Sequence, residues 1–263
     1  MDDLIVLAVG AGVLGLLLGS FANVFIYRWP KGESVITPRS RCPNCKMQVA
    51  WYDNIPVISW IILRGKCRGC TQRISIRYPL VELLTGILFF FVVQRYGVSW
   101  FTLEALVLVF GLVVISFVDL DTFLIPDIFS LGGLALGLAG AALNPEREFM
   151  DAFGGALVGG GFLWLTAYTY WLVRKEEGMG GGDIKLLAWL GAVLGWTAVP
   201  FIILVSSVLG SLVGLSIVVA NKGNMKTVIP FGPYIAIAGV LFLLGGDKLS
   251  EWYLAAFFPW LTG

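Results

Sequence analysis

The chain has 263 residues, of which 58% are hydrophobic and 13% are charged, and its net charge is +1 at pH 7. Its mean hydropathy is +0.86, whereas soluble domains have about a quarter of their residues charged. This composition excludes an ordinary soluble protein and indicates a membrane protein, and the near-neutral charge predicts no nucleic-acid partner. Histidine is absent, which excludes Ser-His-Asp and Cys-His sites and every histidine-ligated metal. Acid–base chemistry must therefore come from carboxylates, lysine, tyrosine or cysteine.

Eight apolar segments are each close to the roughly 20 residues that cross a bilayer as a helix. The first, 4–27, follows an acidic start and lacks a small-residue cleavage site, so we interpret it as a retained span rather than a signal peptide. The other seven lie at 80–96, 100–118, 125–143, 151–173, 184–200, 201–220 and 228–246. The sequence therefore predicts an all-α polytopic membrane protein with about eight transmembrane helices.

A polar segment between the first and second apolar segments is the only long stretch dense in charge. It divides the chain into four expected parts: a first transmembrane helix at 1–27, a small cytoplasmic domain at 28–79, a seven-helix membrane domain at 80–247 and an aromatic, interfacial tail at 248–263. With eight spans, fifteen of the eighteen basic residues fall on the same side of the membrane as the polar segment. Basic residues mark cytoplasmic loops. We therefore expect the small domain and a short loop at 119–124 to be cytoplasmic and both termini to be external.

All four cysteines lie in the polar segment, as Cys42-Pro-Asn-Cys45 and Cys67-Arg-Gly-Cys70. Two CxxC pairs at this separation are typical of a tetrahedral four-cysteine zinc site, and four thiolates close the coordination sphere, so such a zinc is structural. Disulfides are rare in the reducing cytoplasm. A redox-active CxxC pair is the main alternative, although the βαβ context of a thioredoxin-like protein is not visible.

Carboxylates cluster at the predicted cytoplasmic ends of the membrane helices. Asp119, Asp121 and Asp127 lie between the third and fourth apolar segments, and Asp183 ends Gly178-Met-Gly-Gly-Gly-Asp183 before the sixth. Two such groups from different helices can share one proton, so that one activates water while the other donates to a scissile carbonyl. The alternative is a structural role: aspartates at such junctions often cap helices, and Pro126 would place Asp127 in the first turn of its helix. Spacing alone leaves both interpretations open.

Several motifs together resemble the bifunctional type IV prepilin peptidases, which are GxGD-type membrane aspartic proteases. The resemblance covers most of the chain. It rests on Gly19-Ser-Phe-Ala-Asn-Val-Phe-Ile-Tyr-Arg28, the two CxxC pairs, Asn54-Ile-Pro56, the segments 63–68, 74–86 and 119–127, and Gly180-Gly-Gly-Asp183-Ile-Lys185. It implies an enzyme of the bacterial inner membrane that cleaves the basic leader from prepilins and pseudopilins at the cytoplasmic face. It further implies N-methylation of the new amino terminus with S-adenosylmethionine, in the service of type IV pili or type II secretion.

The resemblance assigns the catalytic aspartates to Asp119 and Asp183. Asp119 is expected at the C-terminal end of its helix, near negative partial charge, and Asp183 at an N-terminal end, near positive partial charge. On that basis we expect Asp183 to be the ionised base and Asp119 the protonated acid. Lys185 is expected either to stabilise the charge of Asp183 or to meet lipid headgroups.

The methyl-donor site cannot be found from a glycine-rich nucleotide motif, since none is present. The resemblance places it with the cytoplasmic segment and the neighbouring helix ends, where the polar or small family positions are Asn23, Arg28, Arg77, Glu82 and Gly86. Glu82 could bind ribose hydroxyls or the incoming amine, or it could form an ion pair with Arg77 or an interhelical hydrogen bond.

Two other functions compete with the bifunctional enzyme. One is a peptidase whose cysteine domain only shapes the membrane site, without methylation. The other is a transporter or channel, for which acids near the middle of the spans would be expected. Glycines four residues apart, Gly15 with Gly19 and Gly155 with Gly159, predict close helix packing in the membrane. The sequence specifies neither the particular pilin nor the oligomeric state.

Overall fold

The computed structural model describes residues 2–176, 178–220, 229–246 and 248, and the regular structure of these residues is helical apart from two isolated β-bridges. The chain forms two compact units, residues 1–102 and 103–263, which we describe one at a time. The all-helical fold class is confirmed. The finer division of the chain into four parts stays a prediction.

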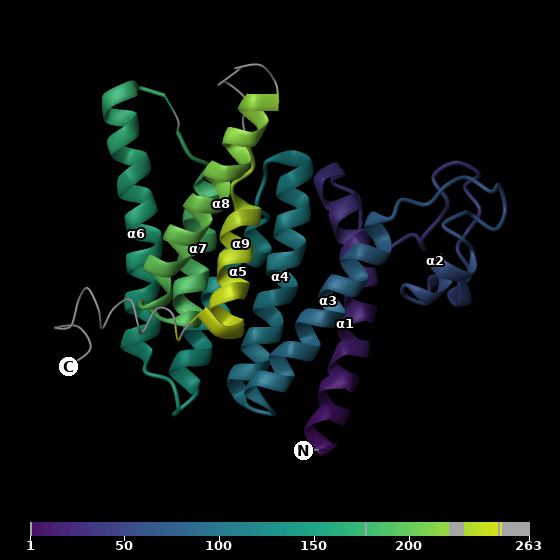
Figure 1. Ribbon diagram of the computed structural model, residues 1–263, viewed down its shortest axis with the longest axis horizontal. Helices are drawn as coiled ribbons and strands as arrows, with labels where there is room; N and C mark the ends of the chain where they lie inside the picture. Colours follow the sequence, from purple (N-terminus) through teal and green to yellow (C-terminus); the bar gives the residue numbers. More distant parts are fainter. Residues whose placement is uncertain (1, 177, 221–228, 247, 249–263) are drawn as a thin grey trace. The chain divides into compact units, whose positions relative to one another are not determined.

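The first unit is organised around two long helices, α1 (Asp2–Arg28) and α3 (Arg77–Tyr96), which lie side by side (Figure 1). A Cβ atom on Gly15 or Gly19 of α1 would come within 2.8 Å of the α3 backbone, so the predicted close packing at these glycines is confirmed. Between the two helices the chain forms three short elements: η1 (Trp29–Lys31), η2 (Trp51–Asn54) and α2 (Ile58–Ile62).

The second unit contains the remaining helices: α4 (Trp100–Thr122, from Leu103 on), α5 (Asp127–Leu143), α6 (Phe149–Arg174), α7 (Gly181–Leu194), α8 (Ala198–Ala220), α9 (Gly232–Leu241) and the π-helical turn η3 (Phe242–Gly246). Helix α7 packs against α5, α6, α8 and α9, and every residue from Leu186 to Val193 is buried. The Trp189 ring fills a notch between Gly111 of α4 and Gly133 of α5, where any side chain in place of hydrogen would collide with the indole. Helix α7 is therefore the centre of this unit.

The far end of α7 is held by a partly buried arginine, Arg147. The Arg147 guanidinium forms an ion pair with Glu104 of α4, and it donates hydrogen bonds of 2.7 and 2.9 Å to the carbonyls of Ala192 and Val193. These carbonyls belong to the last turn of α7, where no intrahelical donor is available. Arg147 therefore fixes the C-terminal end of the helix whose N-terminal end carries Asp183.

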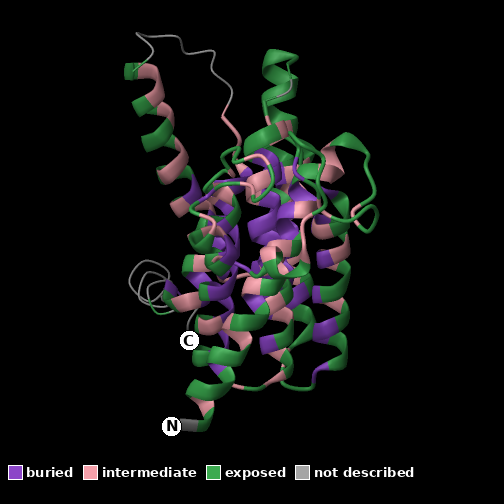
Figure 2. Cartoon of the chain, turned by 90° about the vertical axis from the view of Figure 1, so that its right-hand side faces the viewer, coloured by how far each residue is buried: buried purple, intermediate pink, exposed green. Residues whose placement is uncertain are grey.

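Many large apolar residues of the helices are exposed, and buried and exposed positions alternate along the helices (Figure 2). Among the described residues, α1, α3, α4, α6 and α8 are long and apolar enough to span a membrane, and α5 and α9 with η3 are shorter apolar helices. The chain is thus a multi-pass membrane protein. Each predicted span contains a helix, but the number eight stays a prediction.

Two predicted boundaries are wrong. Helix α4 continues through Asp119 and Asp121 to Thr122, so these residues are helical and not in a loop; the helix ends only at Phe123, whose φ is +57°, before Pro126. Helix α7 ends at Leu194 rather than near residue 200, because Gly195 has φ +84° and stops the helix. Pro200 lies in the first turn of α8, where a missing N–H has no cost. The expected tail at 248–263 lies outside the described residues except for Lys248.

Glycine packing between α6 and α7 gives a first testable prediction. A Cβ atom on Gly155 would collide with the carbonyl of Gly191, whereas one on Gly154 would meet no atom within 4 Å. We expect Gly155→Ala to lower the free energy of unfolding by about 1–3 kcal/mol, measured by thermal or detergent denaturation of the purified protein. The control Gly154→Ala should be neutral or slightly stabilising, since alanine is the better helix former. Equal stability of the two variants would contradict this packing.

Candidate active site and metal centre

Asp119 lies in the last turns of α4 and is almost completely buried, with 4% of its surface exposed. Its Oδ2 atom accepts a hydrogen bond of 2.9 Å from the backbone N–H of Gly232, the first residue of α9. Pro233 follows at the second position of that helix, where its missing N–H is tolerated. Asp119 therefore joins the C-terminal end of one helix to the N-terminal end of another.

Asp183 lies in the first turn of α7 and is also buried, with 8% of its surface exposed. Gly182, which precedes Asp183, and Gly232, whose N–H binds Asp119, both pack against Ile125, so the two carboxyl groups lie in the same part of the unit although 64 positions separate them in the chain. In the described part of the second unit they are the only buried acidic residues. The structure thus brings together the two aspartates that the sequence singled out. Two adjacent buried carboxyl groups disfavour simultaneous ionisation.

Small residues allow the backbones around the pair to approach closely. A Cβ atom on Gly182 would come within 2.8 Å of Ile125, and one on Gly232 would come within 2.7 Å of Asp119 Oδ2 and 3.3 Å of Ile125. By contrast, a Cβ atom on Gly181 would meet nothing within 4 Å. Ile125 therefore lies between Gly182, which precedes Asp183, and Gly232, which binds Asp119. Steric contact explains why position 182 is glycine but does not explain the glycine at position 181.

The other acidic residues of the segment lie at the surface. Asp127 is the first residue of α5, as expected for a first-turn aspartate, and its Oδ1 atom forms an ion pair of 2.7 Å with Lys185. Both side chains are substantially exposed, so this pair contributes little to stability. Lys185 therefore does not meet only lipid headgroups, since it pairs with Asp127, and its effect on the charge of Asp183 stays a prediction. Asp121 is exposed.

The hydrogen bond from Gly232 also changes the electrostatic argument about the pair. We expected Asp119 to face negative partial charge from its own helix, but its carboxylate also meets the positive N-terminal end of α9. A direct N–H donor favours an ionised carboxylate. The structure shows no such backbone donor at the Asp183 carboxylate within the described residues. The basis for choosing Asp183 as the ionised member is therefore removed.

Gly232 and Ile125 were not identified from the sequence. The only signal was Pro230-Phe-Gly-Pro233 at the start of an apolar segment. This pattern predicts that a helix begins there, but it does not predict that Gly232 contacts Asp119. A pocket of about 280 Å³ lies between α8 and this helix start, lined by Ser207, Gly210, Ser211, Ile229, Phe231 and Tyr234. Phe231 immediately precedes Gly232, so the pocket adjoins the segment that binds Asp119.

The four cysteines form one cluster, with all Sγ atoms within 4.8 Å of one another. The Cys42–Cys70 and Cys45–Cys67 sulfur pairs are 3.7 and 4.0 Å apart. A tetrahedral zinc site with Zn–S bonds of about 2.3 Å requires sulfur–sulfur separations of about 3.8 Å. The residues therefore fit a four-cysteine zinc ion, and the expected ligand cluster is present.

Both CxxC turns have the same backbone geometry, which presents the sulfur atoms to one point. In the first, Lys46 N–H donates to the Cys42 carbonyl and Cys42 N–H to Met47; in the second, Thr71 N–H donates to the Cys67 carbonyl and Cys67 N–H to Gln72. The residues after the turns, Lys46 and Thr71, have φ values of +60° and +57°.

Hydrogen bonding favours the thiolate form of one of the four cysteines, Cys70. The backbone N–H of Gln72 and the side-chain amide of Asn44 lower the pKa of the Cys70 thiol to about 6. Beside the second turn, Arg68 binds Asp53 of η2 through two hydrogen bonds of 2.6 and 2.8 Å, which holds the pKa of Asp53 below its usual range.

The five expected methyl-donor residues all make contacts within the first unit. Asn23 donates to the carbonyls of Gly19 and Tyr78, and Arg28 donates to those of Ser34 and Pro38. Glu82 accepts a 2.7 Å hydrogen bond from the backbone N–H of Val57, which has a φ of +60°. A side chain at Gly86 would collide with Leu16, and Arg77 begins α3. These contacts give Asn23, Arg28, Glu82 and Gly86 roles in helix packing or in anchoring loops.

The Gly232 contact yields a second prediction. A methyl group at this position would displace either the Asp119 carboxylate or the start of α9. A displacement of about 1 Å in a reacting group can lower a rate about a hundredfold. We therefore expect Gly232→Ala to reduce kcat by at least tenfold with little change in KM, in an assay of the peptide hydrolysis that the resemblance implies. Gly181→Ala, whose Cβ has free space, is the matched control, and equal kcat values for the two variants would refute the contact's importance.

Two family models match the chain: Bacterial Peptidase A24 N-terminal domain over residues 13–96, and Type IV leader peptidase family over residues 106–215. The chain is similar to proteins named prepilin leader peptidase/N-methyltransferase. It is 41% identical to the Aeromonas hydrophila protein over 93% of each chain, and 43% identical to the Stutzerimonas stutzeri protein over 92% of each. It is 38% identical to the Pseudomonas aeruginosa protein over 92% of this chain and 91% of that one. No solved structure matches the chain.

Proposed function

The chain belongs to the type IV leader peptidase family, and from this premise we propose that it cleaves the leader peptide of prepilins and pseudopilins and N-methylates the new amino terminus. It is thus an aspartic endopeptidase and an N-methyltransferase in one chain. The observation that carries the peptidase assignment is the pair of neighbouring, buried carboxyl groups of Asp119 and Asp183. Peptide hydrolysis by such a pair needs no histidine.

We assign the ionised state to Asp119 and the proton to Asp183, because Gly232 donates its N–H to Asp119. Asp119 then removes a proton from a water molecule, whose oxygen attacks the scissile carbonyl carbon while Asp183 donates its proton to the carbonyl oxygen. Collapse of the tetrahedral intermediate breaks the C–N bond: Asp183 takes back a hydroxyl proton as the new carbonyl group forms, and the amine leaves with the proton that Asp119 holds. Asp119 is then ionised and Asp183 protonated, as at the start of the cycle.

The membrane topology supports a site at the cytoplasmic face of the inner membrane. Both aspartates lie at helix ends, and the excess of basic residues marks that side of the chain as cytoplasmic, with both termini external. A leader is joined to the apolar helix of a pilin, so a cleavage site at the membrane surface matches such a substrate.

Methyl transfer requires S-adenosylmethionine as the donor, and we keep Asn23, Arg28, Arg77, Glu82 and Gly86 as the positions near which it binds. Their internal contacts suggest that Glu82 and Asn23 act by holding the loop and helix geometry rather than by contacting the donor. We assign a structural zinc ion to Cys42, Cys45, Cys67 and Cys70, on the basis of the sulfur separations.

The proposed function is tested with purified protein and a prepilin, incubated with and without S-adenosylmethionine and analysed by mass spectrometry. We expect loss of the leader in both reactions and a mass increase of one methyl group only when the donor is present. Cleavage without methylation would show a peptidase alone. Absence of cleavage with an active control enzyme would overturn the assignment.

A further inference from the structure

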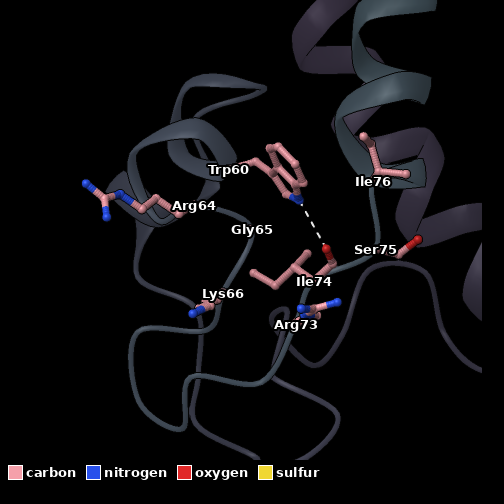
Figure 3. Close-up of a pocket in the computed structure, with 8 residues that line it drawn as sticks. All are labelled: Trp60, Arg64, Gly65, Lys66, Arg73, Ile74, Ser75 and Ile76. Carbon is pink, nitrogen blue, oxygen red and sulfur yellow. Dashed lines mark hydrogen bonds between the residues drawn. The ribbon is translucent and has the colours of Figure 1, made fainter.

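A pocket of about 540 Å³ in the first unit belongs neither to the carboxylate pair nor to the cysteine cluster. Its walls come from α2, from the loop that follows it and from the segment that leads into α3 (Figure 3). The residues that define its chemistry are Trp60, Arg64, Lys66, Arg73, Ile74 and Ile76. Three of these are basic and no acidic residue lines the pocket.

The basic side chains lack compensating charges. Lys66 and Arg73 lie directly opposite each other in an antiparallel β-bridge, where like charges are destabilising. Neither they nor Arg64 have an ion-pair or hydrogen-bond partner for the charged group in the described part of the chain. An anion bound between Lys66 and Arg73 would remove this repulsion.

The wall of the pocket is fixed by hydrogen bonds. The Trp60 indole N–H donates to the Ile74 carbonyl at 3.2 Å, as the dashed line in Figure 3 shows. Ile74 N–H donates to the Gly65 carbonyl at 2.7 Å, and Gly65 N–H to the Trp60 carbonyl at 2.8 Å. A Cβ atom on Gly65 would come within 2.9 Å of the indole, so the loop and the ring are packed in direct contact. The pocket is therefore preformed.

Exposed apolar side chains lie next in sequence to residues that line the pocket, close to the start of the candidate membrane span α3. Ile76 precedes α3, a candidate span, and is 66% exposed, while Ile61 and Ile62 of α2 are 61% and 69% exposed. Exposed isoleucines, a tryptophan and basic residues next to a span are typical of the membrane–water interface, where basic groups attract anionic lipids.

We propose that this pocket binds the phosphate of an anionic phospholipid headgroup. Charge complementarity excludes the two ligands of the proposed function: a basic leader would be repelled, and S-adenosylmethionine, with a sulfonium, an ammonium and one carboxylate, has a net positive charge. The phosphate of a phosphatidylglycerol offers acceptor oxygens to the basic groups, and its acyl chains would extend along Ile61, Ile62 and Ile76. This interaction would hold the loops before α3 against the membrane surface.

The test uses the full-length, metal-loaded protein in neutral detergent and native mass spectrometry to measure bound dioleoylphosphatidylglycerol, with dioleoylphosphatidylcholine at equal concentration as reference. The pocket variant is Arg64→Gln with Arg73→Gln. The matched control is Arg39→Gln with Arg41→Gln, which removes the same charge from exposed positions of the same polar segment outside the pocket. Unchanged metal content establishes that each variant is folded around the cysteine cluster.

We expect the wild type and the control to retain phosphatidylglycerol in preference to phosphatidylcholine, and the pocket variant to bind it about tenfold more weakly. If both double variants bind phosphatidylglycerol equally weakly, the effect is one of general charge and the pocket assignment is wrong. Equal binding of phosphatidylglycerol and phosphatidylcholine by the wild type would also overturn the assignment. A third arm adds inorganic phosphate. If it displaces the lipid at a concentration no higher than that of the lipid itself, the ligand is free phosphate and the lipid assignment is wrong.

Discussion

Replacing Asp119 or Asp183 with asparagine should abolish leader cleavage, lowering kcat/KM by about four orders of magnitude or more. Asparagine preserves the size of each side chain, so the buried contacts around α4 and α7 remain. However, an amide at position 119 cannot accept a proton from water, and an amide at position 183 cannot supply one to the carbonyl oxygen. The two residues act as a unit, and the double variant should therefore be no less active than either single variant.

The matched control for this experiment is Asp127→Asn, which removes an acid from the same segment but from an exposed ion pair with Lys185. We expect it to retain cleavage within a few-fold, since surface ion pairs contribute little. Methylation of an already trimmed pilin should persist in all three variants, which shows that they are folded. Retained cleavage in either Asp119→Asn or Asp183→Asn would reject the pair.

The membrane helices could be predicted from the sequence because each long apolar run is a local signal. Their ends were less predictable. A loop was expected at 119–124, but α4 continues until Phe123 adopts a positive φ. A span was expected to reach residue 200, but Gly195 ends α7 at Leu194. In both cases a conformational requirement at one residue decided the boundary, and polarity alone did not reveal it.

The candidate sites differ in how far each is determined by residues that are close together in the sequence. The cysteine cluster could be predicted because each CxxC turn places two ligands by itself, and only the meeting of the two turns is a tertiary event. The identity of the aspartates came from the resemblance, and their closeness from the structure. The electrostatic environment of Asp119 could not be predicted, because its donor, Gly232, lies 113 positions further along the chain. Likewise, the cationic pocket depends on Trp60 packing onto Gly65 and Ile74, which no motif indicates.

Replacing Cys67 with serine should release the metal from the cysteine cluster. A hydroxyl group is a poor zinc ligand, and a structural zinc ion in small domains contributes about 10–16 kcal/mol of binding free energy that is coupled to folding. We expect the zinc content to fall from one ion per chain to nearly none. Hydrogen exchange should become faster across residues 41–73, where two isolated bridges and short helical turns provide little other stabilisation. Cys42→Ser, in the other turn, should have the same effect, because both turns share one ion.

The control for the cysteine variants is Arg41→Gln, which alters the neighbour of a ligand but removes no sulfur atom, and it should keep its zinc. A strong chelator added to the wild type should reproduce the faster exchange of residues 41–73. Titration of thiols in denaturant should then find four free thiols per chain, because the sulfur atoms bind a metal rather than each other. Unchanged metal content in Cys67→Ser, or fewer than four thiols before reduction, would favour a redox pair over zinc. The sulfur separations of 3.7 and 4.0 Å fit the edges of a tetrahedron and are far longer than a disulfide bond of about 2.05 Å, which is why we expect zinc.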